Sequence, residues 1–222
     1  VVFFIIPQAM DIAMHNGFCR YTKEMVGKPL GDVTEMADFE TFKAAVYDEI
    51  RYLMSMGNER INVEMIAEKE LFPDVFRSAL MKDGVKVGKD MFNRRFKFEN
   101  GSCMGAVGGV NAGNALYAIK KLVFDEKKYT MAQLLEALDA DWVGHEDMQK
   151  DFKDAPKYGN AIKEVDDLVA EVYQLYADTC MSLPSAYGDS LKPNAISISA
   201  HQPGGAVTGA TAPGRKGGGV LA

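Results

Sequence analysis

The residue types best suited to chemistry gather near the end of the chain, where residues 201–205 read His-Gln-Pro-Gly-Gly. They follow a β-prone run, residues 195–200, which predicts a buried strand. In α/β sheets, the side chains that face a ligand stand at the carboxyl ends of strands. Gln202 can donate and accept hydrogen bonds, and Gly204 leaves space beside it. A structural turn explains the same residues equally well, so both interpretations stay open.

A second glycine-rich segment, residues 105–114, precedes a predicted helix. The N-terminus of a helix can bind a phosphate group. However, the segment lacks the G-x-G-x-x-G spacing and the Lys-Ser/Thr pair of nucleotide-binding loops. We therefore expect close backbone packing at a strand-to-helix turn rather than nucleotide binding.

The other reactive side chains are scattered along the sequence. His15 stands near the end of a predicted helix, where the helix dipole stabilises it, and an acid–base role is the less favoured alternative. Cys103 has no histidine near it in sequence and is expected to be a small buried residue. Glu64, Glu68 and Glu70 have charges of both signs nearby and indicate a solvated helix face. The three histidines are far apart and the three cysteines form no C-x-x-C pair, so we predict no metal site.

The composition is that of an ordinary globular protein. The 222 residues are 47% hydrophobic and 25% charged, with a formal net charge of −6. This acidic balance argues against nucleic acid or an anionic membrane as the main partner, and the apolar residues 1–6 are too few to span a bilayer. The odd number of cysteines favours a reducing cytosol, so we expect a cytoplasmic protein. Both ends of the chain look cut, since it starts at a valine with no signal peptide.

Hydrophobic periodicity predicts a mostly helical chain with a few short buried strands, as in an α/β layer or barrel. Asp38 is expected to cap one amphipathic helix and Gly57 to end it, while Thr130 and Gln133 form a capping-box pattern. The expected helices cover residues 10–18, 38–56, 62–71, 73–82, 111–124, 130–142 and 162–181. Extended structure is expected at residues 1–6, around Phe92, Phe96 and Phe98 before glycines interrupt it, and at 195–200 after a linker at 184–193.

Longer motifs resemble a known family. Residues 72–80 read Phe-Pro-Asp-Val-Phe-Arg-Ser-Ala-Leu, and residues 111–124 read Asn-Ala-Gly-Asn-Ala-Leu-Tyr-Ala-Ile-Lys-Lys-Leu-Val-Phe. Residues 156–160 read Pro-Lys-Tyr-Gly-Asn, residues 199–203 read Ser-Ala-His-Gln-Pro, and residues 208–211 read Thr-Gly-Ala-Thr. In order and spacing, these motifs resemble the pyruvate formate-lyase-like glycyl radical enzymes through nearly the whole chain.

The resemblance implies a fold, a chemistry and a set of partners. The expected fold class is α/β, a helix-rich fragment of the ten-stranded glycyl radical enzyme barrel. Residues 1–222 would be part of a single catalytic domain, truncated at both ends. The family's catalytic cysteine would lie upstream of this chain and its radical glycine downstream, so no catalytic residue and no bound cofactor is expected here. An activating enzyme that uses S-adenosylmethionine and an iron–sulfur cluster would install the glycyl radical.

Within the family, the chain looks most like the aryl- and alkylsuccinate synthase alpha subunits, of the benzylsuccinate synthase type. The resemblance lies in Val-Phe-Phe at residues 2–4, His-Asn-Gly at 15–17 and Ala-His-Gln-Pro at 200–203. Such enzymes add a hydrocarbon, an alkylaromatic compound or an alkane, to fumarate by forming a C–C bond in anaerobic hydrocarbon degradation, in some cases with small accessory subunits. On this resemblance Gln202 would hold a fumarate carboxylate and Gly204 would border the hydrocarbon. The small side chains at Gly108, Ala112 and Ala115 would give a roomier pocket than in toluene-type enzymes.

Two alternatives remain at this stage. The chain would belong to a glycyl radical arylacetate decarboxylase or to a diol- or choline-type lyase on the same fold. A non-catalytic helical binding module is the alternative of another class. Residues beside the family's catalytic cysteine would separate the first alternative from fumarate addition, whereas independent cooperative folding of the chain would favour the binding module.

Overall fold

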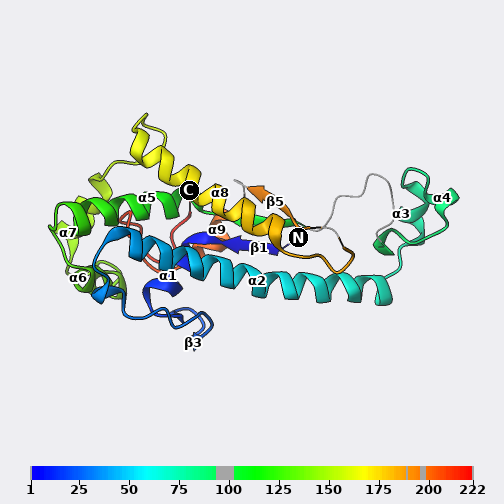
Figure 1. Cartoon of the computed structure of the whole chain (residues 1–222), viewed down its shortest axis with the longest axis horizontal. Coiled ribbons are helices and arrows are strands. Elements are labelled where there is room, and N and C mark those ends of the chain that lie inside the picture. Colours follow the sequence, from blue (N-terminus) through cyan, green and yellow to red (C-terminus); the bar gives the residue numbers. More distant parts are fainter. Residues whose placement is uncertain (1, 94–102, 189, 196–198, 222) are drawn as a thin grey trace.

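A computed structural model describes residues 2–93, 103–188, 190–195 and 199–221 of the chain. Helices surround a small parallel sheet, and the C-terminal half of the long helix α2, Phe39–Leu71, extends beyond this body (Figure 1). We call the C-terminal half of α2 together with α3, Val75–Leu80, and α4, Gly84–Val87, the arm.

The described part of the sheet has three parallel strands in the order β1–β4–β5. They are β1 (Val2–Ile5), β4 (Cys103–Val107) and β5 (Lys192–Ala195). Ile5 pairs with Val107, and Ala106 pairs with Ala195. Because the strands are parallel, their carboxyl ends meet at one edge of the sheet. A separate hairpin joins β2 (Phe18–Cys19) to β3 (Glu24–Met25).

The remaining elements pack around this sheet. The α-helices are α1 (Ile6–Met14), α5 (Gly109–Ile119), α6 (Met131–Asp139), α7 (Glu146–Asp154), α8 (Lys163–Ser182) and α9 (His201–Ala206). Short 3-10 turns cover Val33–Glu35 and Met91–Asn93, and a π-helix, Lys120–Asp125, extends α5. Among the described helices, none is long and apolar enough to cross a lipid bilayer.

Helix α2 corrects the prediction of two helices separated at Gly57. The helix runs unbroken for 33 residues, and Gly57 lies inside it. A glycine in a helix costs about 1 kcal/mol relative to alanine, but here packing outweighs this cost. Met54 and Ile61 on either side of Gly57 are buried in the core. The predicted cap is confirmed, since the Asp38 carboxylate accepts a hydrogen bond from the Thr41 N–H at 2.8 Å.

Helix α6 confirms its predicted start and corrects its predicted end. Thr130 and Gln133 form the complete capping box. The helix ends at Asp139 rather than near residue 142, because Asp141 and Trp142 have φ angles of 51° and 66°, in the left-handed region that a right-handed helix excludes. The Trp142 side chain is 1% exposed and fills the core instead.

The remaining expectations differ in outcome. Helix α1 starts earlier than predicted, directly after β1, with Pro7 in its first turn where a missing N–H costs little. Helix α8 matches its prediction closely. Strand β4 includes Gly105, which does not interrupt it. Phe96 and Phe98, where extended structure was expected, lie outside the described residues.

The late strand predicted at residues 195–200 is described only in part. Strand β5 covers Lys192–Ala195 and so begins before the predicted start, residues 196–198 lie outside the described part, and α9 begins at His201. The segment that holds Gln202 and Gly204 is therefore a short helix rather than a loop that follows directly on a strand. Pro193 within β5 cannot donate a hydrogen bond to a sheet, which fits its place in a strand whose far side is unpaired in the described residues.

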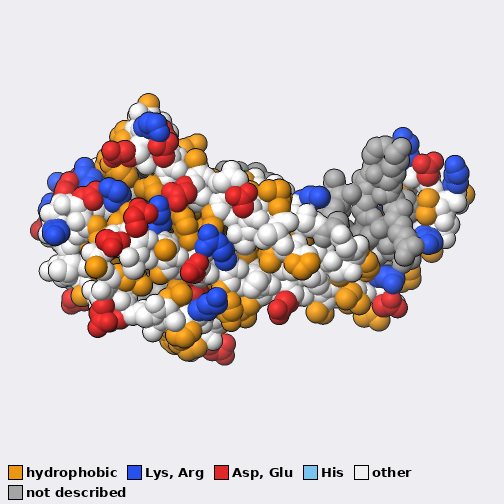
Figure 2. Space-filling model, in the orientation of Figure 1, with side chains coloured by type: hydrophobic (Ala, Val, Ile, Leu, Met, Phe, Trp, Pro, Cys, Tyr) orange, Lys and Arg blue, Asp and Glu red, His pale blue; other side chains and the backbone are white. Residues whose placement is uncertain are grey.

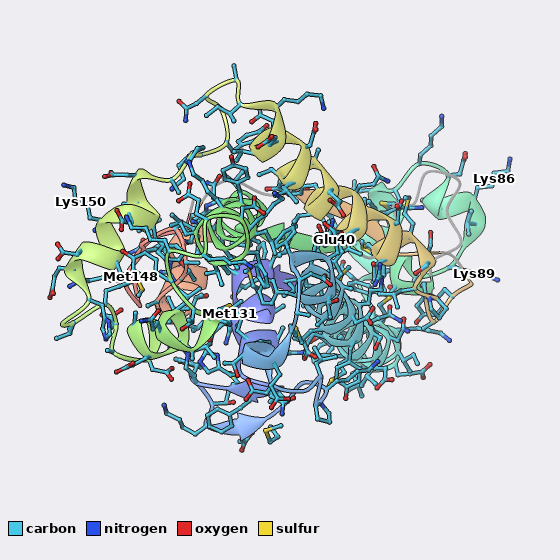
Figure 3. The ribbon with its side chains drawn as sticks, turned by 60° about the vertical axis from the view of Figure 1, so that its left-hand side comes forward. Glu40, Lys86, Lys89, Met131, Met148 and Lys150 are labelled. Atoms are coloured by element: carbon cyan, nitrogen blue, oxygen red, sulfur yellow. The ribbon has the colours of Figure 1, made fainter. Side chains whose placement is uncertain are left out.

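The core and the arm differ in how they bury apolar side chains. One cluster joins α1, α2, α5, α6, α7 and α8 around the sheet, with Trp142, Tyr176 and Phe42 among its largest buried side chains. Figure 3 places buried Met131 and Met148 on the α6–α7 side and shows Lys86 and Lys89 extending outward from the arm. The arm exposes large apolar side chains, which are Val63, Ile66, Leu71, Phe72, Val75, Phe76, Leu80 and Val85. Hydrophobic side chains, in orange, are visible at this end of the molecule in Figure 2.

A buried carboxyl group on α2 gives the fold a pH dependence. Glu49 is 0% exposed, and its Oε2 accepts a hydrogen bond from the Lys28 N–H at 3.0 Å. Its Oε1 has no hydrogen-bond partner among the described residues. Burial raises the pKa of Glu49, and the Lys28 N–H and charge offset only part of this rise.

We expect Glu49 to destabilise the fold increasingly as pH rises. The unfolded state loses the glutamate proton first, so the free energy of unfolding falls between the ordinary pKa and the raised folded pKa. Glu49→Gln has no proton to lose and should remove this part of the pH slope. Urea unfolding of wild type and variant between about pH 4 and pH 8 measures it. Glu59→Gln, at an exposed position on the same helix, is the control, and equal slopes for all three proteins would contradict the expectation.

Candidate functional site

The carboxyl-end edge of the sheet brings together two of the predicted site residues. Gly108 follows β4 directly, and Gly204 on α9 packs over the ends of both β1 and β4. A Cβ atom added at Gly204 would lie 3.2 Å from Val107 Cγ1 and 3.3 Å from Leu221 Cδ1. A Cβ atom added at Gly108 would lie 3.2 Å from the same Leu221 atom. The two glycines thus flank Leu221 at the edge where α/β sheets place their ligands.

Both the backbone conformation and the close packing at position 108 require a glycine. Its φ of +76° lies in the left-handed region, which costs a residue with a side chain about 1–2 kcal/mol. A Cβ atom there would also lie 2.7 Å from Pro7 Cγ and 2.8 Å from Pro7 Cδ. This close approach confirms the predicted strand-to-helix packing turn.

The N-terminus of α5 is already occupied by a tyrosine. A Cβ atom at Gly109 would lie 2.5 Å from Tyr173 Cζ. Burial raises the pKa of the Tyr173 hydroxyl, and hydrogen bonds from the Val110 and Gly109 N–H groups partly offset this rise. Because the Tyr173 ring packs against Gly109 at this terminus, the geometry favours packing over phosphate binding.

Ala112 and Ala115 lie farther along α5 and line a different space. Both are buried, and they face a cavity of about 10 Å³. The cavity is also lined by Pro7, Met10, Asp11, Met14, Asn111, Leu138 and residues 210–212. This volume is about that of one water molecule. Among the described residues, the space that Ala112 and Ala115 line is thus far smaller than a hydrocarbon. Substrate contact by the two alanines, and the roomier pocket, stay predictions.

Gln202 stands apart from this cavity. It is exposed in the first turn of α9, beside half-buried His201, whose Nδ1 lies 3.0 Å from the Leu221 carbonyl oxygen. Gly108 and Gly204 thus lie at the sheet edge, with Gln202 on the same helix as Gly204. Ala112 is one turn beyond Gly108, and its N–H donates to the Gly108 carbonyl at 3.1 Å. Substrate contact by Gln202 and Gly204 stays a prediction.

A charged network beside the cavity was missed by sequence reasoning. Arg20 Nη2 lies 2.5 Å from Asp11 Oδ1, and Arg20 Nη1 lies 2.9 Å from Asp139 Oδ1. His15 Nε2 reaches the same Asp139 oxygen at 3.1 Å. His15 stands at the C-terminal cap of α1, which confirms its predicted place at a helix end. No sequence signal links Asp11 to Asp139, because only the tertiary fold brings α1 against α6.

The three cysteines are free thiols. Cys103 is half-buried rather than buried as expected, whereas Cys19 and Cys180 are buried. Within the described residues, no group of histidine, cysteine and carboxylate side chains is arranged to hold a metal ion. Glu64, Glu68 and Glu70 are exposed, as predicted for a solvated helix face.

The parallel sheet, the helices that cover it and the glycines at its carboxyl edge place the chain in the α/β class of proteins. Its similarity to known proteins shows the family. Residues 1–205 match the family model "Pyruvate formate lyase-like". The chain belongs to this family. Among curated relatives, (2S)-3-sulfopropanediol dehydratase of Klebsiella oxytoca is 29% identical over 212 residues, which are 95% of this chain and 26% of the relative. Indoleacetate decarboxylase of Tractidigestivibacter scatoligenes is 27% identical, over 99% of this chain and 27% of the relative.

Solved structures give the same result. Glycerol-bound B12-independent glycerol dehydratase from Clostridium butyricum matches with a TM-score of 0.92 and 30% identity, over 99% of this chain and 28% of that chain. Hydroxyproline dehydratase from Clostridioides difficile matches with a TM-score of 0.92 and 25% identity, over 99% of this chain and 28% of that chain.

These matches bear out the expected family and fold. The structure is a helix-rich part of the glycyl radical enzyme barrel with a small parallel sheet. The chain spans about a quarter of the length of the curated relatives, since it covers 26% and 27% of the two named here. The relatives named here are dehydratases and a decarboxylase, which matches the first alternative left open by the sequence rather than the succinate synthases.

Proposed function

We propose that this chain forms the substrate-bordering part of a glycyl radical dehydratase that acts on a small hydroxylated molecule. The observation that carries the proposal is the recurrence of dehydratases among both kinds of relative, at 29% identity in sequence and at a TM-score of 0.92 in structure. The named substrates of these relatives, a sulfopropanediol, glycerol and hydroxyproline, all carry hydroxyl groups.

The chain's own residues suit this role in three ways. Gly108 and Gly204 let Leu221 and α9 pack closely against the carboxyl ends of β1 and β4, next to Gln202. The exposed Gln202 amide can donate to and accept from a hydroxyl group. Leu221, between the two glycines, supplies an apolar wall. Together they would orient a hydroxylated substrate, while the radical-bearing residues would belong to other parts of the whole enzyme.

The partners follow from the family. The radical would be installed by an activating enzyme that uses S-adenosylmethionine and an iron–sulfur cluster, and small accessory subunits would be further partners. Arylacetate decarboxylation is a second candidate, supported by indoleacetate decarboxylase and by the 4-hydroxyphenylacetate decarboxylase subunit of Clostridioides difficile, at 27% and 26% identity. Fumarate addition to a hydrocarbon, expected from the short motifs, finds no support in these relatives, and dehydration replaces it as the leading proposal.

Product analysis separates these reactions. The native polypeptide that carries this chain should be activated without oxygen and offered 1,2-propanediol, glycerol, trans-4-hydroxy-L-proline, an arylacetate, and toluene with fumarate. Loss of water from one hydroxylated compound is the expected result. Release of carbon dioxide from the arylacetate alone would establish the decarboxylase instead, and consumption of fumarate would restore the succinate synthase interpretation.

A further inference from the structure

The end of the arm presents apolar side chains to the outside. On α3, Phe76 and Leu80 stand one turn apart and are 76% and 72% exposed. Val75 of α3 and Val85 of α4 are exposed as well, and both line a groove of about 340 Å³. We call these four side chains, Val75, Phe76, Leu80 and Val85, the apolar arm patch. Exposed apolar patches of this kind mark interaction surfaces.

Polar groups inside the arm give the patch its shape. Asp90 Oδ2 accepts a hydrogen bond from the Asp74 N–H at 2.6 Å and lies 3.1 Å from Ser78 Oγ. Ser78 Oγ in turn accepts a hydrogen bond from the Met91 N–H at 2.8 Å. A Cβ atom added at Gly84 would lie 1.8 Å from the Ser78 carbonyl oxygen, so α4 approaches α3 this closely only with a glycine there. The arm is therefore held by its own hydrogen bonds, while its apolar side chains face outward.

The chemistry of the groove favours an apolar occupant. Its buried polar side chain, Ser78, already has partners, and so does Asp90. Residues 74–90 carry four basic and three acidic side chains, so their charges nearly cancel. Arg77 also pairs locally with Asp74 at 3.0 Å. Neither the groove nor its surroundings offers the one-sided charge that would attract a nucleic acid or a strongly charged protein.

The body of this chain does not cover the patch. The arm extends beyond the body (Figure 1), and the four side chains are exposed among the described residues. The match to the Clostridium butyricum glycerol dehydratase covers 99% of this chain with a TM-score of 0.92, so it includes the arm as well as the body. The arm thus has the same extended position in a whole enzyme. Since the match covers 28% of that longer chain, most of it lies outside the matched region and can supply a covering surface.

We propose that the apolar arm patch docks against an apolar segment of the same polypeptide, from the part of the enzyme that lies outside residues 1–222. An apolar side chain of this segment would fill the groove beside Val75 and Val85, and Phe76 and Leu80 would pack around it. The inference does not depend on which reaction the enzyme catalyses.

Photo-cross-linking in the purified native polypeptide tests the proposal. The probe p-benzoylphenylalanine should replace Phe76, and in a control it should replace Lys86, whose side chain extends outward from the arm in Figure 3. A cross-link forms only where the probe contacts another residue. We expect the probe at position 76 to give a several-fold higher yield than at position 86. The product should keep the mass of one chain on a denaturing gel, and the linked peptide should lie outside residues 1–222.

Three results would overturn the proposal. A covalent product with the mass of two chains would show that a second copy occupies the patch. A linked peptide within residues 1–222 would show that the arm folds back onto this chain. A yield no higher than that of the control would show that the patch stays open to solvent.

Hydroxyl-radical footprinting of the unaltered polypeptide is a second test that introduces no new side chain. We expect the Phe76 ring to be oxidised several-fold more slowly in the folded protein than in urea, as is expected for Phe42 in the core. Oxidation of Phe76 at equal rates in the two states, with Phe42 protected, would contradict the docking of the patch.

Discussion

Gly108→Ala should be among the most damaging single-methyl changes in this chain, costing about 3 kcal/mol of unfolding free energy. The left-handed backbone at φ +76° accounts for about 1–2 kcal/mol of this loss. The overlap with the rigid Pro7 ring, at 2.7 Å and 2.8 Å, accounts for the rest. Activity should fall as well, because the overlap displaces the carboxyl ends of β1 and β4.

The matched control is Gly144→Ala. Gly144 has φ +81° and no atom within 4 Å of an added Cβ atom. This variant carries the backbone cost without the overlap, so it should lose about 1–2 kcal/mol. Urea unfolding of the native polypeptide compares the two variants. Equal losses would show that Pro7 yields to the methyl group and that the edge is less tightly packed than the structure indicates.

Gly113→Ala should be similarly damaging, through helix packing rather than backbone strain. An added Cβ atom would lie 2.4 Å from Val169 Cγ2 and 2.8 Å from Val169 Cα, where α5 crosses α8. Alanine favours a helix over glycine by about 1 kcal/mol, but the overlap with backbone forces the two helices apart. We expect a net loss of about 2–3 kcal/mol.

Gly57→Ala is the control for this prediction and should have the opposite sign. Gly57 also lies inside a helix, but its added Cβ atom meets only Met104 Cε, at 3.2 Å. The flexible end of a methionine can move aside, so the variant should keep up to about 1 kcal/mol of the helix gain. Thermal or urea unfolding of both variants measures the difference, and a stabilised Gly113→Ala would contradict the assigned α5–α8 contact.

Sequence reasoning succeeded where local chemistry decides the structure. The Asp38 cap and the Thr130–Gln133 capping box depend on residues three apart, which a sequence displays directly. It failed at Gly57, because the core packing that continues α2 past this glycine is tertiary. It also missed the early start of β5 at Lys192 and the short helix that carries Gln202.

Two of the predicted site residues, Gly108 and Gly204, lie together against Leu221, and their contact with a substrate stays a prediction. The Arg20 network was not found, because Arg20 and Asp139 are 119 residues apart. The short motifs that favoured fumarate addition cover few residues, whereas the match to a dehydratase extends over 212.

The central claim is that the sheet edge at Gly108, Gly204 and Gln202 borders a hydroxylated substrate. A structure of the native polypeptide with bound 1,2-propanediol tests it most directly. We predict that a diol hydroxyl lies within hydrogen-bond distance of the Gln202 amide and that the diol carbons contact Gly108 or Gly204. A diol bound away from this edge, with no contact to Gly108, Gly204 or Gln202, would contradict the claim.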